Sequence, residues 1–126
     1  MADYRSRTCL IVDNDDETRD RFGELLGRHQ FDIRQARDGI EALEVCRKAM
    51  PDVILVDSSV PKTGGLRFLR HLRRTSNGKR PVVLFCARSG DFRQFGAAIA
   101  GGASECLTKP FDAELLDFKL QQSGAV

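Results

Sequence analysis

The sequence predicts an α/β fold in which five parallel strands lie between two layers of helices. Apolar runs of strand length alternate with amphipathic stretches of helix length five times along the chain. The run Val53-Ile54-Leu55-Val56-Asp57 contains four consecutive branched apolar residues, which is typical of a strand buried on both faces of a parallel sheet. Since alternating strands and helices form right-handed crossovers, helices should cover both faces.

The five predicted strands are short and mostly apolar. They span Thr8 to Asp13, Phe31 to Ala36, Val53 to Asp57, Pro81 to Cys86 and Ser104 to Thr108. The second strand alternates only weakly, so we expect it at or near a sheet edge. Five such strands in 126 residues favour a flavodoxin-like three-layer sandwich with strand order 2-1-3-4-5.

The five predicted helices carry apolar residues at helical spacing. They span Asp15 to Arg28, Gly39 to Met50, Gly64 to Thr75, Phe92 to Ala100 and about 112 to 121. Asp15 and Asp16 are expected to be N-terminal capping acids of the first helix. We expect residues 123–126 to fray.

Composition predicts one domain over residues 1–126, with a core from about 7 to 121. The net charge of +2 is too close to neutral to imply nucleic-acid binding by itself. No apolar run reaches the length of a membrane span, and Met1 to Thr8 lacks the apolar core of a signal peptide. We therefore expect a cytoplasmic protein. Because that compartment is reducing, we expect its four cysteines to be small buried thiols.

Polar groups from three strands are expected to meet at one mouth of the sheet. Asp13 and Asn14 follow the first strand, Asp57 ends the third, and Lys109 follows the fifth. Two close carboxylates repel each other unless a cation joins them, and Mg²⁺ fits oxygen ligands of this kind. The backbone carbonyl of Ser59 is a further candidate ligand. The sequence therefore predicts a magnesium site here.

Asp57 has two interpretations. A carboxylate beside a metal and an ammonium group is a plausible nucleophile for phosphoryl transfer, which would form an aspartyl phosphate. The alternative is structural, in which Asp57 caps the next helix or pairs with Lys109.

Four segments, in order and at these spacings, resemble the receiver domain of bacterial two-component response regulators over essentially the full chain. They are LIVDND (Leu10 to Asp15), ILVDSSVPKTGG (Ile54 to Gly65), VLFCA (Val83 to Ala87) and LTKPF (Leu107 to Phe111). The resemblance implies that Asp57 is the phosphoacceptor, that Asp13 and position 14 form the Mg²⁺ pocket, and that Lys109 contacts the phosphoryl group. It also implies a cis Lys109–Pro110 bond.

The resemblance also implies partners. A histidine kinase or a phosphotransfer protein would donate the phosphoryl group. The last two helices and the fifth strand would form a homodimer or effector contact. The domain would be regulatory, and any catalysis would concern only its own phosphorylation and dephosphorylation.

Three positions depart from the family pattern. Asn14 stands where a second acid is usual, so we expect weaker Mg²⁺ binding and slower phosphorylation. Cys86 occupies the position of a Ser or Thr whose hydroxyl bonds the phosphoryl oxygen in the family, and a thiol is a poorer donor. Cys106 occupies the position of an aromatic residue that swings inward on activation, which a small thiol cannot imitate, so both steps of the usual switch are impaired. The loop after Cys86 would then have to carry the signal. A redox-gated Cys86–Cys106 disulfide is a further hypothesis.

Two alternative functions remain open at this point. One is a pseudo-receiver that binds partners without phosphorylation. The other, more remote, is a small haloacid-dehalogenase-like phosphatase, whose motif the run from Asp13 to Glu17 matches only in its two Asp. A run of basic residues without an acid is expected to be the solvated face of a helix, not a nucleic-acid site; it comprises Arg67, Arg70, Arg73, Arg74, Lys79 and Arg80.

Overall fold

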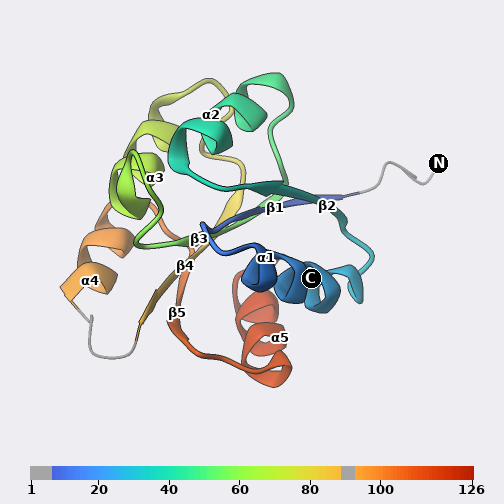
Figure 1. Cartoon of the computed structure of the whole chain (residues 1–126). Coiled ribbons are helices and arrows are strands. Elements are labelled where there is room, and N and C mark those ends of the chain that lie inside the picture. The colour runs from blue at the N-terminus through green and yellow to red at the C-terminus, as the bar shows by residue number, and fades with distance from the viewer. Residues whose placement is uncertain (1–6, 89–92) are drawn as a thin grey trace.

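A computed structural model describes residues 7–88 and 93–126, and its strands form one parallel sheet (Figure 1). The strands are β1 (Thr8–Val12), β2 (Asp32–Ala36), β3 (Val53–Asp57), β4 (Val82–Arg88) and β5 (Glu105–Lys109). Their order is β2-β1-β3-β4-β5. This confirms the flavodoxin-like order and the edge position of the second strand.

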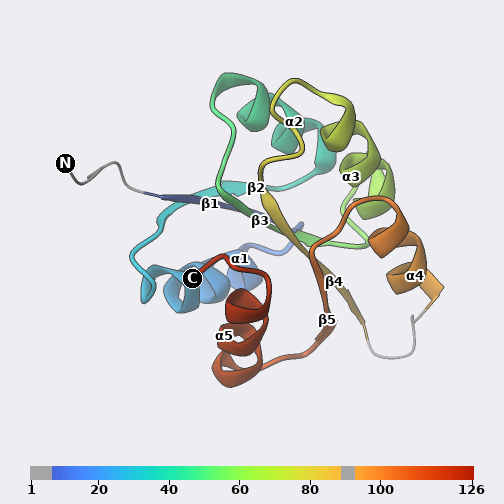
Figure 2. The ribbon, with the colours of Figure 1, turned by 180° about the vertical axis from the view of Figure 1, so that it is seen from behind.

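Helices cover both faces of the sheet. They are α1 (Asp16–Gly27), α2 (Gly39–Lys48), α3 (Gly64–Arg74), α4 (Arg93–Ala100) and α5 (Ala113–Gln122). Helices α1 and α5 lie on one face, and α2, α3 and α4 lie on the other (Figures 1 and 2). The three-layer sandwich is therefore confirmed.

The core divides into two clusters because successive strand residues point to opposite faces. In β3, Val53 and Leu55 pack in the cluster under α1 and α5, whereas Ile54 and Val56 pack in the cluster under α2, α3 and α4. All four are at most 2% exposed. Burial of each such side chain contributes roughly 1.5–3 kcal/mol, so the branched run of β3 holds both helical layers to the sheet.

Helix ends follow the sequence signals. Asp15 is the N-cap of α1 and accepts a hydrogen bond of 2.9 Å from the Thr18 N–H, as predicted. Asp38 and Asp112 cap α2 and α5 in the same way. The Lys109–Pro110 peptide bond is cis, in agreement with the resemblance.

The C-terminal residues do not fray, so that prediction was wrong. Gly124 has a φ of 79°, which turns the chain back onto the core. Ala125 is completely buried, its N–H donates to the Leu120 carbonyl at 2.9 Å, and its carbonyl accepts from the Arg7 guanidinium. Backbone bonds and apolar burial therefore hold the tail.

Strand β4 is longer than predicted and runs on past Cys86 to Arg88, where Arg88 pairs with Lys109 of β5. Residues 89–92 lie outside the described residues. The start of the predicted fourth helix at Phe92 and most of the loop after Cys86 lie there too. No helix within the described part of the chain has the length and apolar character that crossing a bilayer would need.

Candidate functional site

The ends of β1, β3 and β5 bring two carboxylates and an ammonium group together. Lys109 Nζ donates to Asp13 Oδ2 at 2.5 Å and to Asp57 Oδ1 at 2.9 Å. The side chains of Asp13, Asp57 and Lys109 are 8%, 15% and 18% exposed. The ammonium group therefore lies between the carboxylates at a rim that solvent still reaches.

Backbone and side-chain bonds hold Asp13 in place. Its N–H continues the β1 ladder by donating to the Ala36 carbonyl at 3.1 Å, and its Oδ1 accepts from the Asp15 N–H at 2.9 Å. Arg19 of α1 is 7% exposed and donates to the Asp13 carbonyl at 2.6 Å and to Gln35 at 2.9 Å. We infer that Arg19 positions Asp13. Sequence reasoning missed this residue, because one Arg in a charged helix carries no signal by itself.

The start of α3 sets the position of Asp57. The Ser59 N–H donates to Asp57 Oδ2 at 3.0 Å, and Asp57 itself pairs with Cys86 of β4. A Cβ on Gly65 would lie 2.9 Å from the Asp57 carbonyl oxygen and 2.9 Å from the Phe85 ring. Only glycine therefore allows the helix to begin this close to the end of β3.

The site's charges determine the protonation of Lys109. Burial alone would lower the pKa of the ammonium group, but hydrogen bonds to Asp13 and Asp57, together with their charges, outweigh burial and hold the pKa above its usual value. Lys109 Nζ also lies 5.6 Å from the centre of the Phe22 ring, which stacks on Phe111 at 4.7 Å. The lysine is therefore charged at neutral pH.

The donor set fits Mg²⁺ better than a soft metal. Asp13 and Asp57 supply carboxylate oxygens, and the Ser59 carbonyl accepts no hydrogen bond from the described residues. Asn14 follows Asp13 and is exposed. No group of three or more His, Cys, Asp or Glu suited to a metal occurs in the described part of the chain. Two carboxylates plus a carbonyl suit an ion that keeps several waters, as Mg²⁺ does.

The cysteines do not form the hypothesised disulfide. Cys106 pairs with Phe85, so Cys86 and Cys106 are offset by one residue and face opposite sides of the sheet. Cys86 is buried in the cluster under α1 and α5, whereas Cys106 packs against the other cluster. Burial raises the pKa of the Cys86 thiol, which is therefore protonated at neutral pH. The redox hypothesis is wrong because the sheet separates the two thiols.

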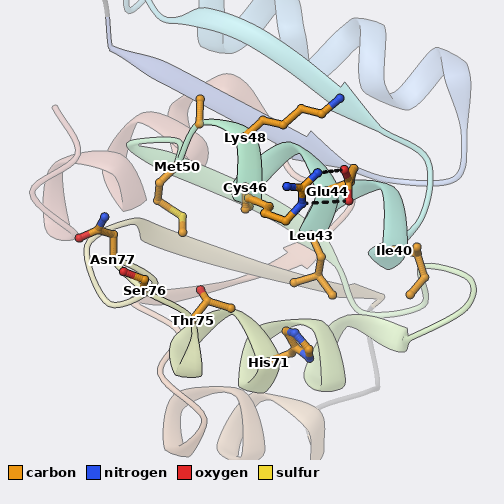
Figure 3. Close-up of a pocket in the computed structure, with 12 residues that line it drawn as sticks. Ile40, Leu43, Glu44, Cys46, Lys48, Met50, His71, Thr75, Ser76 and Asn77 are labelled. Carbon is orange, nitrogen blue, oxygen red and sulfur yellow. Dashed lines mark hydrogen bonds and ion pairs between the residues drawn. The ribbon is translucent and has the colours of Figure 1, made fainter.

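Two of the hollows on the surface of the described residues differ in their relation to the site. One of about 430 Å³ lies beside the site and is lined by Thr18, Arg21, Phe22, Arg88, Lys109, Pro110 and Phe111. The other, of about 560 Å³, lies between α2 and α3 (Figure 3). Glu44 is the single acidic residue that lines this hollow, and it forms an ion pair with Arg47. His71 of α3 also lines the hollow. This second hollow shares no residue with the strand-end site.

The fold and the strand-end carboxylates define a flavodoxin-like domain with a charged site at the carboxyl edge of its sheet. A protein-family model, the response regulator receiver domain, matches residues 9–121. The chain therefore belongs to the response regulator receiver domain family.

Similar proteins agree with this assignment. A transcriptional regulatory protein CpxR homolog from Haemophilus influenzae is 37% identical over 109 residues, which are 85% of this chain and 46% of that protein. Response regulator MprA from a Mycobacterium species is 32% identical over 107 residues, which are 85% of this chain and 46% of that protein. The chain thus spans less than half the length of these relatives. The crystal structure of the chemotaxis response regulator CheY4 of Vibrio cholerae superposes with a TM-score of 0.87 at 29% identity, covering 94% of this chain and 99% of that one.

Proposed function

We propose that the chain is a phosphorylatable receiver in which Asp57 accepts a phosphoryl group from a histidine kinase or a phosphotransfer protein in the cytoplasm. The observation that carries the proposal is the position of Lys109, whose ammonium group joins Asp13 and Asp57 at the open rim of the sheet. Such a group can neutralise the charge that an incoming phosphoryl group brings. The family membership supports the same role.

In the proposed reaction, an Asp57 carboxylate oxygen bonds to phosphorus while the bond from phosphorus to the donor's imidazole nitrogen breaks. The leaving imidazole keeps the electron pair and takes a proton from solvent. Mg²⁺ held by Asp13, Asp57 and the Ser59 carbonyl would supply the charge that binds the phosphoryl oxygens. Lys109 keeps its contact with Asp13 and moves its remaining donors to the phosphoryl group.

Signalling after phosphorylation would differ from the usual switch. The protonated Cys86 thiol lies at the site but is a weaker donor than a hydroxyl. Ile99 of α4 and Leu115 and Phe118 of α5 are exposed by 53%, 36% and 52%. These side chains support the proposed homodimer or effector contact on the last two helices.

Phosphorylation is tested with acetyl phosphate and Mg²⁺, followed by intact mass. We expect the wild type to gain one phosphoryl group and Asp57→Asn to gain none. Asp32→Asn is the matched control, since Asp32 is exposed on the edge strand β2. A wild type that gains no mass at any Mg²⁺ concentration would favour the pseudo-receiver, for which Asn14 and Cys86 are the supporting residues.

A further inference from the structure

A basic surface follows α3 and the turn after it. Between Asp57 and Asp91 the sequence has eight Lys and Arg and no Asp or Glu, whereas the whole chain has 20 basic and 18 acidic residues. Charge is therefore strongly segregated, although the net charge is small. We call the exposed part of this segment the α3 basic surface; it comprises Arg67, Arg70, Arg74, Lys79 and Arg80.

The described residues place little compensating negative charge on this surface, although Arg80 lines a hollow together with Asp32 and Asp52. Among residues 7–88 and 93–126, none of its five side chains forms an ion pair with a carboxylate. The acids of the neighbouring helix α2, Glu41 and Glu44, are paired with Arg37 and Arg47. Helix α4, on the other side, contains no acid.

Helix stability does not account for these charges. The helix dipole favours cations in the last turn, which suits Arg74, but it disfavours Arg67 in the first turn. Arg67 and Arg70 are three residues apart and Arg70 and Arg74 four apart, so neighbouring like charges oppose helix formation. A partner that carries negative charge would remove this repulsion.

Arg73 of the same helix differs from these residues because backbone carbonyls of the protein bind its guanidinium group. Its guanidinium donates to the Gly102 carbonyl at 2.7 and 3.0 Å, and to the Gly78 and Pro81 carbonyls at 2.9 Å. It thereby fixes the turns after α3 and α4. Beside it, a hollow of about 470 Å³ is lined by Arg73, Arg74, Thr75, Asn77, Gly78, Lys79 and Arg80, without an acid.

The sequence alone favoured a solvated helix face for these residues, but the lack of ion pairs at the five side chains changes that interpretation. We propose that the α3 basic surface binds the phosphate backbone of a nucleic acid without reading its sequence. The surface has no exposed large apolar residue within it, whereas protein interfaces are anchored by buried aromatic or aliphatic side chains. The apolar residues of α3, Phe68, Leu69 and Leu72, are buried in the core, so the helix has no apolar face left to insert into a lipid surface. A chain of phosphates needs only cations.

The spacing of the arginines suits such a backbone. Arg67, Arg70 and Arg74 recur at helical spacing on one side of α3, over a rise of about 10 Å. Successive phosphates of one strand are separated by an axial rise of about 3.4 Å, so three arginines can meet one strand over about four nucleotides. Lys79 and Arg80 extend the contact beyond the end of the helix. Because α3 starts beside Asp57 and runs away from it, this surface is separate from the strand-end site.

The test is fluorescence anisotropy of a short labelled duplex of mixed sequence with the whole chain, at two salt concentrations. If four or five phosphates are neutralised, raising the salt from about 50 to 200 mM should weaken binding by about 150- to 500-fold. Arg70→Gln with Arg74→Gln should lower affinity at low salt at least tenfold. The matched control is Arg21→Gln with Arg28→Gln, which removes the same charge from exposed positions on and after α1, on the opposite face of the sheet, and should change affinity less than threefold.

Several results would overturn the proposal. The first is that the protein does not bind the duplex at low salt. The second is that both double variants lose affinity for the duplex by the same factor. The third is that the protein binds poly-glutamate or anionic vesicles more tightly than the duplex. Thermal melting of each variant shows whether it is folded. Asp57→Asn should bind the duplex like the wild type, so the outcome is independent of phosphorylation.

Discussion

Replacing Lys109 with Met removes the charge between Asp13 and Asp57 and keeps most of the apolar stem. Removing one partner of a fully buried ion pair costs about 3–5 kcal/mol. Since these side chains are 8–18% exposed, solvent screens part of this cost, and we expect a loss of roughly 2–3 kcal/mol in the free energy of unfolding. For 126 residues, this corresponds to a fall in Tm of about 8–11 °C.

The assay is urea unfolding at neutral pH, first with a chelator and then with Mg²⁺. Mg²⁺ should stabilise Lys109→Met more than the wild type, because the ion can take the place of the missing ammonium group. Lys48→Met, at an exposed position, is the control and should change stability by less than about 0.5 kcal/mol. If Lys109→Met is as stable as the wild type in chelator, or gains nothing extra from Mg²⁺, the role assigned to Lys109 is refuted.

The same variant should alter the pH dependence of stability. The pKa of Lys109 is raised in the folded protein. Its contribution is therefore complete below the pKa of an unfolded lysine, about 10.4, and is lost as the pH rises through the folded value. As the pH rises from neutral, the difference in stability between the wild type and Lys109→Met should therefore shrink only when the pH becomes strongly alkaline.

Three further predictions test other parts of the structure. Asn14→Asp should raise Mg²⁺ affinity about five- to tenfold through one added charge, measured by calorimetry; unchanged affinity would contradict the weak-pocket prediction. Gly65→Ala should cost about 1–3 kcal/mol because its Cβ has no room, whereas Gly96→Ala, with nothing within 4 Å, should stabilise α4 by about 0.5–1 kcal/mol; urea midpoints separate them. Burial raises the thiol pKa of Cys9 and Cys86, so their unfolded forms ionise first and stability should fall above about pH 8.5, by about 1.4 kcal/mol per pH unit for each thiol. A pH dependence that is the same in Cys9→Ala would count against this.

Local patterns predicted most of the fold, because the signals for each element are contiguous. The branched run of β3 and the capping Asp15 both appear in the structure as expected. The convergence of Asp13, Asp57 and Lys109 followed from one topological rule, that parallel strands present their carboxyl ends at one edge.

Contacts between distant residues were not predictable in this way. The buried Arg19 bonds to Asp13 and to Gln35 of β2, and Ala125 packs against residues from the other end of the chain. The Cys86–Cys106 hypothesis was wrong for a related reason. Knowing that two strands are adjacent does not determine their register, that is, which residues pair. An offset of one residue reverses the face of the sheet to which a side chain points.

The amino-acid sequence alone therefore determined the helices and strands, the order of the strands in the sheet, and which three side chains gather at its carboxyl edge. Tertiary structure decided how close these groups lie and that an ammonium group sits between two carboxylates. It also decided that, among the described residues, Arg67, Arg70 and Arg74 form no ion pair. The physical reason is range: hydrophobic periodicity acts over a few residues, whereas strand register and charge pairing depend on segments that only folding brings together.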